Sequence, residues 1–238
     1  ATFIYFVLPK PVSHLKDKAP AINQSGFFDT KDEAGEKENK KLLSPYNDKY
    51  YMAFLLFTTL YATAFFQFFT SLPLYYKNIY HLSEKHIGWL MSFNGIGVAV
   101  IEMFLIYYIQ NKWTKFNFIS LGVALLIGGF LILIPMHWIY ILVISMGFIT
   151  LSEMFAMPFM STYAISKAPK ATMGQYMALY SMSWSIAQIL APLLGTNVIE
   201  HFGFNMLWEV LSGIALISFC GFRWMEAGSK VNVVGREE

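Results

Sequence analysis

The sequence contains little cysteine and little charge, and both shortages restrict the class of protein. Cys220 is the single cysteine among 238 residues, which excludes an internal disulfide framework and a metal site built from several thiolates. Charged residues make up 13% of the chain, against about 25% in soluble domains. Hydrophobic residues reach 56% and the mean hydropathy is +0.47. This composition predicts a membrane protein, and the net charge of +2 gives no indication of nucleic-acid binding.

The sequence also lacks the residue patterns of an enzyme, a metal site or an ATP-driven pump. No GxxxxGKS/T phosphate-binding motif is present, so the energy for any transport would have to come from an ion gradient. Every histidine falls in the charged linker or in a connection between apolar segments: His14, His81, His86, His137 and His201. Glu84 lies between two of them, but such a group is more typical of a solvated loop than of a metal site. We therefore expect no catalytic pair, no metal and no cofactor.

Six apolar segments follow a charged linker. They cover residues 50–76, 86–109, 116–135, 138–168, 172–198 and 204–224. Each reaches the roughly 20 residues that a tilted transmembrane helix needs. Because the connections between them are short and polar, neighbouring helices should run antiparallel. We predict an all-α membrane protein with a six-transmembrane-helix bundle over residues 49–226.

The positions of lysine and arginine predict the orientation in the membrane. Residues 1–9 are apolar but too short to span a bilayer, and we interpret them as the end of a preceding transmembrane helix. Residues 10–48 have the composition of a solvated, charged linker. Positive residues gather on one side of the bundle, at Lys112, Lys115, Lys167, Lys170 and Arg223, whereas Lys77 and Lys85 fall on the other side. By the positive-inside rule, the linker and a tail at residues 227–238 are cytoplasmic. We expect a multi-pass protein of a bacterial inner membrane.

A carboxylate lies in the middle of the fourth segment. At that depth an unpaired carboxylate costs at least ~2.5 kcal/mol, so it usually faces a partner or a water-filled path. Glu153 is therefore the main candidate for proton coupling, and the alternative is that it joins two helices through hydrogen bonds. Pro158 lies just beyond it and predicts a bend, which is either a gating hinge or a packing kink.

The second segment carries two further polar residues in the membrane region. Asn94 and Glu102 are two turns apart on roughly the same side of the expected helix. Glu102 lies deep enough to be costly. It is either a second proton-handling group or a structural carboxylate that pairs with a helix outside this chain.

Polar and aromatic stripes predict where a substrate would bind. In the first segment, threonine and glutamine side chains recur on one face from Thr59 to Thr70, which suits either a wetted lining or hydrogen bonds to neighbouring backbone or helices. In the fifth segment, aromatic residues from Tyr176 onward recur at four-residue steps, as in ordinary packing or the wall of a cavity for an amphiphilic molecule. Methionines adapt their shape to varied ligands. The candidate substrate-binding residues are Thr63, Gln67, Asn94, Met157, Tyr180, Trp184 and Gln188.

Several short motifs together resemble the carboxy-terminal half of a major facilitator superfamily transporter. These are the Glu153 to Pro158 pair, Ala168-Pro169, Gly174-Gln175-Tyr176 and Ala191-Pro192-Leu193-Leu194-Gly195. Residues 70–97, TSLPLYYKNIYHLSEKHIGWLMSFNGIG, are similar to the passage from helix seven to helix eight of the drug/proton antiporter branch. The proton-coupled oligopeptide branch shares the Glu-to-Pro and Ala-Pro pattern and is the second choice.

The resemblance implies a role for each of the six helices. The first and fourth would line the central path, the second and fifth would face an amino-terminal six-helix half, and the third and sixth would face lipid. Apart from the resemblance, Pro158 and Pro192 are the candidate hinges. Residues 111–117, NKWTKFN, occupy the place of the family's cytoplasmic gate motif but lack its glycine, aspartate and arginines.

The sequence thus predicts a secondary active transporter, specifically a proton-coupled exporter of small amphiphilic compounds. In the expected cycle Glu153 takes up a proton, and its neutralisation lowers the cost of exposing that face to a drier environment. The expected partners are a small-molecule substrate, protons, the lipid bilayer and the amino-terminal half. Two alternatives remain: a proton-coupled importer of peptides or other nutrients, and a membrane scaffold without transport activity.

Overall fold

The computed structural model describes residues 45–109, 112–134 and 138–234, all within one compact unit, Asn39–Glu238. The predictions for residues 1–9 and for residues 10–44 of the linker lie outside the described residues. Side chains are described as far as Gly228.

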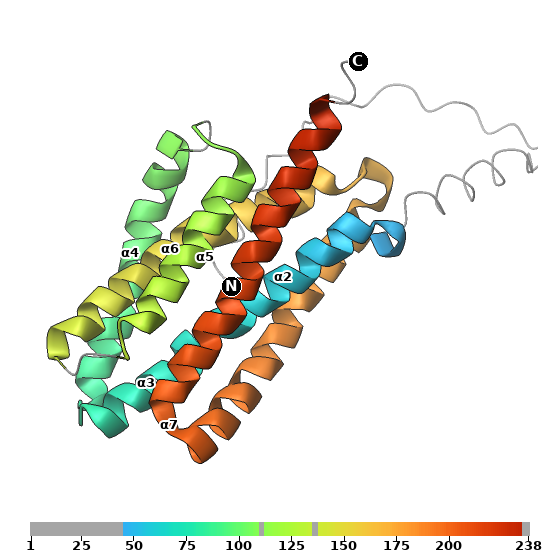
Figure 1. Cartoon of the computed structure of the whole chain (residues 1–238). Coiled ribbons are helices and arrows are strands. Elements are labelled where there is room, and N and C mark those ends of the chain that lie inside the picture. Colours follow the sequence, from blue (N-terminus) through green and yellow to red (C-terminus); the bar gives the residue numbers. More distant parts are fainter. Residues whose placement is uncertain (1–44, 110–111, 135–137, 235–238) are drawn as a thin grey trace, which may run out of the picture. The chain divides into compact units, whose positions relative to one another are not determined.

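The described residues form helices joined by short connections, with no strand among them. In chain order they are η2 (Pro45–Asn47), α2 (Lys49–Phe65), α3 (Gln67–Ile79), α4 (Glu84–Ile109), α5 (Lys115–Leu131), α6 (Ile139–Lys167), η3 (Lys170–Thr172) and α7 (Met173–Val234). Figure 1 shows them gathered in one bundle. The predicted all-α membrane bundle is confirmed.

Four helical stretches are long and apolar enough to cross a membrane: Lys49–Ile79, Glu84–Ile109, Ile139–Lys167 and Lys170–Gly228. The third predicted segment corresponds to α5, which is shorter and ends at Leu131. The last stretch contains both the fifth and the sixth predicted segments. Gly203, with φ 79° and ψ −179°, interrupts α7 between them. This positive φ favours glycine, which has no Cβ to clash. Figure 1 shows the chain reversing there, so that the orange and red parts of α7 form a helical hairpin.

The first predicted segment is divided into α2 and α3 rather than being one continuous helix. The break is at Phe66, which has φ −65° and ψ −11°. Its amide keeps the regular bond to the carbonyl of Ala62 at 2.8 Å, but its own carbonyl accepts from the amide of Phe69, only three residues on, at 3.1 Å. Threonine hydroxyls bond to main-chain carbonyls on both sides, from Thr63 to Thr59 at 2.8 Å and from Thr70 to Phe66 at 3.2 Å. Such hydroxyl-to-carbonyl bonds tend to bend helices, and the hydropathy of the segment does not reveal them.

Helix α5 packs closely against α6 and against the second part of α7. A Cβ placed at Gly122 would lie 2.7 Å from the main-chain nitrogen of Ala156 and 2.9 Å from the carbonyl oxygen of Ser152, so only glycine permits this approach of α5 to α6. Near one end of the bundle, the Trp208 ring lies 5.2 Å from that of Tyr75 and 5.6 Å from that of Phe130, which joins α7, α3 and α5. The close contact at Gly122 holds α6, which carries Glu153, against α5.

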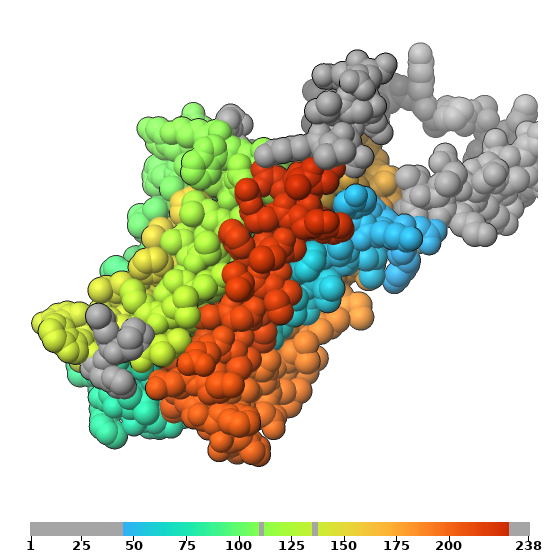
Figure 2. All heavy atoms as spheres, viewed as in Figure 1, coloured from blue at the N-terminus to red at the C-terminus, as the bar shows by residue number. Residues whose placement is uncertain are grey.

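Helix α4 is by far the most exposed of the long helices. Only 6% of its most apolar stretch is buried, against 50% for α6. Its neighbour in the bundle is chiefly α6, and large apolar side chains such as Phe93 and Phe104 are exposed on it. Figure 2 shows α4, in green, at one edge of the bundle. This leaves an apolar surface beside the polar residues of α4.

Candidate functional site

A hydrogen-bonded cluster joins α4 to α6 inside the apolar region. Asn94 on α4 donates from Nδ2 to Oε2 of Glu153 on α6 at 3.2 Å. The hydroxyl of Thr150, one turn earlier on α6, lies 2.6 Å from Oδ1 of Asn94 and 2.8 Å from the carbonyl oxygen of Met146. Asn94 and Thr150 are buried, whereas Glu153 keeps part of its surface exposed. The cluster thus holds a carboxylate in place while leaving it within reach of a proton.

A shallow pocket of about 510 Å³ lies further along the same two helices and is closed on one side by α7. Its lining residues are Glu102 from α4, Met157, Pro158 and Ser161 from α6, and Tyr180 and Trp184 from α7. Glu102 follows Asn94 by two turns, about 12 Å at 1.5 Å per residue, and Met157 follows Glu153 by one turn. The structure therefore brings together Glu102, Met157, Pro158, Tyr180 and Trp184, which the sequence analysis selected from three separate segments.

This pocket combines one acidic group with apolar and aromatic walls. The rings of Tyr180 and Trp184 meet edge to face with centroids 6.3 Å apart. No hydrogen bond or ion pair to Glu102 is found among the described residues. Pro158 lies within a helix that continues to Lys167, and its carbonyl accepts from the hydroxyl of Thr162 at 2.7 Å. A pocket of this character suits an amphiphilic molecule whose polar group approaches Glu102.

Thr63 and Gln67 lie elsewhere and are occupied in helix packing. Gln67 is fully buried and donates from Nε2 to the carbonyl oxygen of Ala191 on α7 at 2.7 Å, while its Oε1 accepts from Ser71. Thr63 is also buried, with its hydroxyl bonded to a carbonyl of its own helix. Neither residue borders the Glu102 pocket. Gln67 thus joins α3 to α7, whereas Thr63 bonds to the main chain of its own helix. Both side chains make hydrogen bonds of the kind that the sequence left open as an alternative to a wetted lining.

Two other selected residues are also outside the Glu102 pocket. Gln188 borders a separate pocket of about 340 Å³ with Phe66, Phe69 and Thr70. Pro192 lies within α7, directly after the carbonyl to which Gln67 is bonded. Thr150 was not among the candidate residues of the sequence analysis. Its position one turn before Glu153 on the same face could have predicted that it belongs to the same cluster.

Comparison with known proteins places this helical bundle and its polar site in a family. The family model of the Major Facilitator Superfamily matches residues 1–192, which is most of the chain. The chain belongs to the Major Facilitator Superfamily. Members of this superfamily are generally non-enzymatic carriers of small molecules. The apolar helices of the chain agree with a multi-pass integral membrane protein.

Two curated members of the superfamily are similar to the chain. One is a Na(+), Li(+), K(+)/H(+) antiporter of Planococcus maritimus, 25% identical over 196 residues, which covers 75% of this chain and 45% of that protein. The other is the uncharacterized MFS-type transporter YttB of Bacillus subtilis (strain 168), 26% identical over 161 residues, which covers 65% of this chain and 39% of that protein. The chain therefore spans less than half the length of the curated superfamily members it matches.

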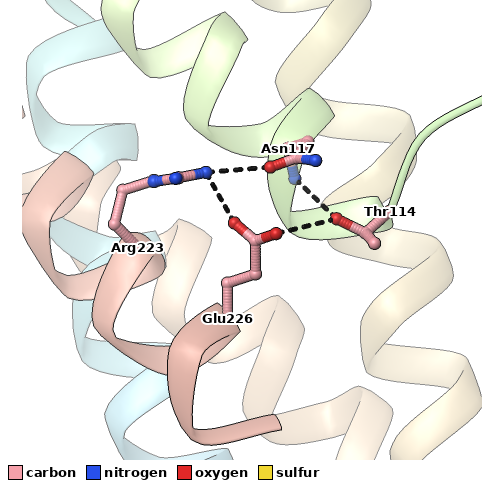
Figure 3. Close-up of polar contacts among 4 residues, drawn as sticks. All are labelled: Thr114, Asn117, Arg223 and Glu226. Atoms are coloured by element: carbon pink, nitrogen blue, oxygen red, sulfur yellow. Dashed lines mark hydrogen bonds and ion pairs between the residues drawn. The ribbon is translucent and has the colours of Figure 1, made fainter. Parts of the chain in front are cut away.

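The connection before α5, where the superfamily resemblance predicts a gate motif, is tied to the last helix. Figure 3 shows Arg223 donating from Nη1 to Oδ1 of Asn117 at 2.8 Å and to Oε2 of Glu226 at 2.6 Å. Thr114 donates to Oε1 of Glu226 at 3.3 Å and accepts from the amide of Asn117 as the N-cap of α5. Glu226 is buried, which the sequence analysis did not predict. Arg223 and Glu226 of α7 thus place two charged side chains against this connection.

Proposed function

We propose that this chain forms part of a proton-coupled antiporter that exports small amphiphilic compounds. The observation that carries the proposal is that the Glu153–Asn94–Thr150 cluster lies on the same two helices as the pocket bordered by Glu102, and that Met157 of this pocket follows Glu153 by one turn. A group that exchanges protons and a pocket that accepts an amphiphile on the same helices can influence each other's occupancy, and this coupling is reciprocal.

Glu153 is the proposed proton carrier. Ionised, it is held by the amide of Asn94, but it still places a charge in an apolar region, where a carboxylate costs about 2.5–3.5 kcal/mol. Protonation removes that charge, so the face of α6 that carries Glu153 can move into a drier environment. The proton thereby favours the state of the transporter that opens to the opposite side.

The pocket between α4, α6 and α7 is the proposed substrate site. Met157 and Trp184 offer apolar and polarizable walls that adapt to different shapes. Glu102 offers a carboxylate for a positively charged or hydrogen-bonding end of the substrate, and Tyr180 a hydroxyl. The supporting fact is that all of these residues border one pocket.

The test uses the full-length protein reconstituted in liposomes with an acidic interior. Adding an amphiphilic dye such as ethidium should release protons from the liposomes as dye and proton exchange. Glu153→Gln keeps the hydrogen bond with Asn94 but cannot carry a proton, so it should abolish exchange while the protein remains folded. Glu209→Gln, which changes an exposed carboxylate of α7, is the matched control and should exchange normally. Normal exchange by Glu153→Gln would refute the proposal.

A second candidate function is exchange of a monovalent metal cation for protons. It is favoured by the relative named as a Na(+), Li(+), K(+)/H(+) antiporter and by the oxygen atoms in the cluster. A half-turn of the Asn94 amide would present its oxygen together with those of Glu153 and Thr150, and hard cations prefer oxygen ligands. In the same liposomes, proton release on adding Na⁺ or K⁺ but not dye would favour this function. Uptake of dye along an inward proton gradient would favour an importer instead.

A further inference from the structure

A second polar pocket lies between α5 and the part of α7 that follows Gly203. It is an open hollow of about 430 Å³, within the range of about 300–1,000 Å³ that ligand pockets occupy. Its lining residues are Trp113, Asn117, Ser120, Leu121, Ala124, Phe219 and Arg223. None of them borders the Glu102 pocket.

This pocket has a polar end and an apolar end. The polar end lies at and beside the start of α5, where the lining residues are Trp113, Asn117 and Arg223. Ala124 lies two turns beyond Asn117 in α5, about 10 Å away at 1.5 Å per residue. Leu121, Ala124 and Phe219 carry no polar side-chain atom. A ligand that fits must therefore be polar at one end and apolar at the other.

Ser120 borders the pocket with an unused hydroxyl. Its side chain is 3% exposed, and the hydroxyl has no hydrogen-bond partner among the described residues. Buried hydroxyls are normally hydrogen-bonded, and this one is available to donate to an acceptor in the pocket. An anionic oxygen in the pocket would provide it.

The polar end is arranged for an anion. The hydrogen bonds of Arg223 Nη1 to Asn117 and Glu226 hold the guanidinium beside the pocket (Figure 3), while half of its side chain stays exposed. A guanidinium has five N–H donors, so it can bind an anion in addition. The amino-terminal end of α5 adds a partial positive charge there. Lys112, in the preceding connection, and Lys115, the first residue of α5, add positive charge to this end of the helix.

The surroundings of the pocket resemble a surface that meets lipid. Trp113 and Trp224 are each 59% exposed at this end of the helices, as aromatic residues at a membrane interface are. Leu216 and Ile217, further along α7, are also exposed. Figure 2 shows this face, with the red part of α7 beside the yellow-green α5.

We propose that this pocket binds an anionic phospholipid. The phosphate is held by Arg223, Asn117 and Ser120, and the beginning of an acyl chain lies against Leu121, Ala124 and Phe219. The site is independent of the proposed transport reaction, because it shares no residue with it.

Native mass spectrometry of the full-length protein tests this proposal, with phosphatidylglycerol and phosphatidylcholine added in equal amounts. Arg223→Gln combined with Glu226→Gln removes the positive charge without leaving a buried carboxylate unpaired. Ser120→Ala removes the hydroxyl with little effect on packing. Lys85→Gln, which changes an exposed lysine at the other end of the bundle, is the control.

The wild type and Lys85→Gln should retain phosphatidylglycerol in preference to phosphatidylcholine. The double variant should lose roughly tenfold in affinity and Ser120→Ala roughly threefold, as expected for a charged and a neutral hydrogen bond. If the double variant does not fold, Ala124→Trp, which fills the apolar end, should give the same loss. The proposal fails if the wild type shows no preference or if the variants bind as the wild type does. It also fails if inorganic phosphate alone displaces the lipid, since the ligand would then be a free anion.

Discussion

Replacing Gly122 by alanine tests the packing that holds α6 in position. A Cβ at this site would lie 2.7 Å from the main-chain nitrogen of Ala156, 2.8 Å from its Cβ and 2.9 Å from the carbonyl oxygen of Ser152. Carbon atoms pack best at about 3.5–4.0 Å, so α5 and α6 would have to separate by most of an ångström. Two of the three atoms belong to the main chain, and no rotamer change can move them.

The expected loss of stability follows from two opposing effects. Overpacking a close contact costs about 1–3 kcal/mol. Alanine is a better helix former than glycine by about 0.8–1.0 kcal/mol, which offsets part of that cost. Because the clash is with the main chain, we expect the upper part of the first range and a net loss of about 1–2 kcal/mol. Ser152 and Ala156 flank Glu153, so the shift of α6 should also disturb its bond to Asn94 and slow transport.

Thermal unfolding in detergent, followed by fluorescence-detected size-exclusion chromatography, measures this loss. Gly147→Ala is the matched control, because it lies on α6 and a Cβ there meets nothing within 4 Å. It should be as stable as the wild type or slightly more stable. Adding Ala156→Gly to Gly122→Ala removes one of the three clashing atoms and should restore only part of the loss. If Gly122→Ala unfolds at the same temperature as Gly147→Ala, the close contact between α5 and α6 is wrong.

Two further predictions concern the polar residues. Asn94→Ala removes the hydrogen bond to Glu153; bonds to charged groups contribute about 1.5–3 kcal/mol, so proton-coupled exchange in liposomes should fall at least about tenfold. Asn197→Ala, on an exposed part of α7, should leave exchange unchanged, and equal rates for the two variants would contradict the site. Gly195→Ala places a Cβ within 2.6 Å of side-chain oxygens of α3 and should lower the unfolding temperature. Gly213→Ala meets nothing within 4 Å and should not, and equal stability of the two would contradict the α3–α7 contact.

The sequence by itself determined the helices and the membrane-protein class. Predicted residues 86–109 correspond to α4 (Glu84–Ile109), and predicted residues 138–168 to α6 (Ile139–Lys167), because the length of an apolar segment is a local property of the chain. The presence of a carboxylate in an apolar stretch was equally visible, and it led directly to Glu153. The motifs led to the superfamily, which the family model confirmed.

Only the tertiary structure decided which polar residues meet. Asn94 and Glu153 are 59 positions apart, and whether they bond depends on the rotation and register of α4 against α6. Gln67 is polar as well, yet the orientation of α3 directs its side chain to a carbonyl of α7 instead of to a pocket. A stripe on one helix shows which residues share a face, but not what that face meets. The partner is fixed by long-range packing, such as the close contact at Gly122, and no local pattern in the sequence records it.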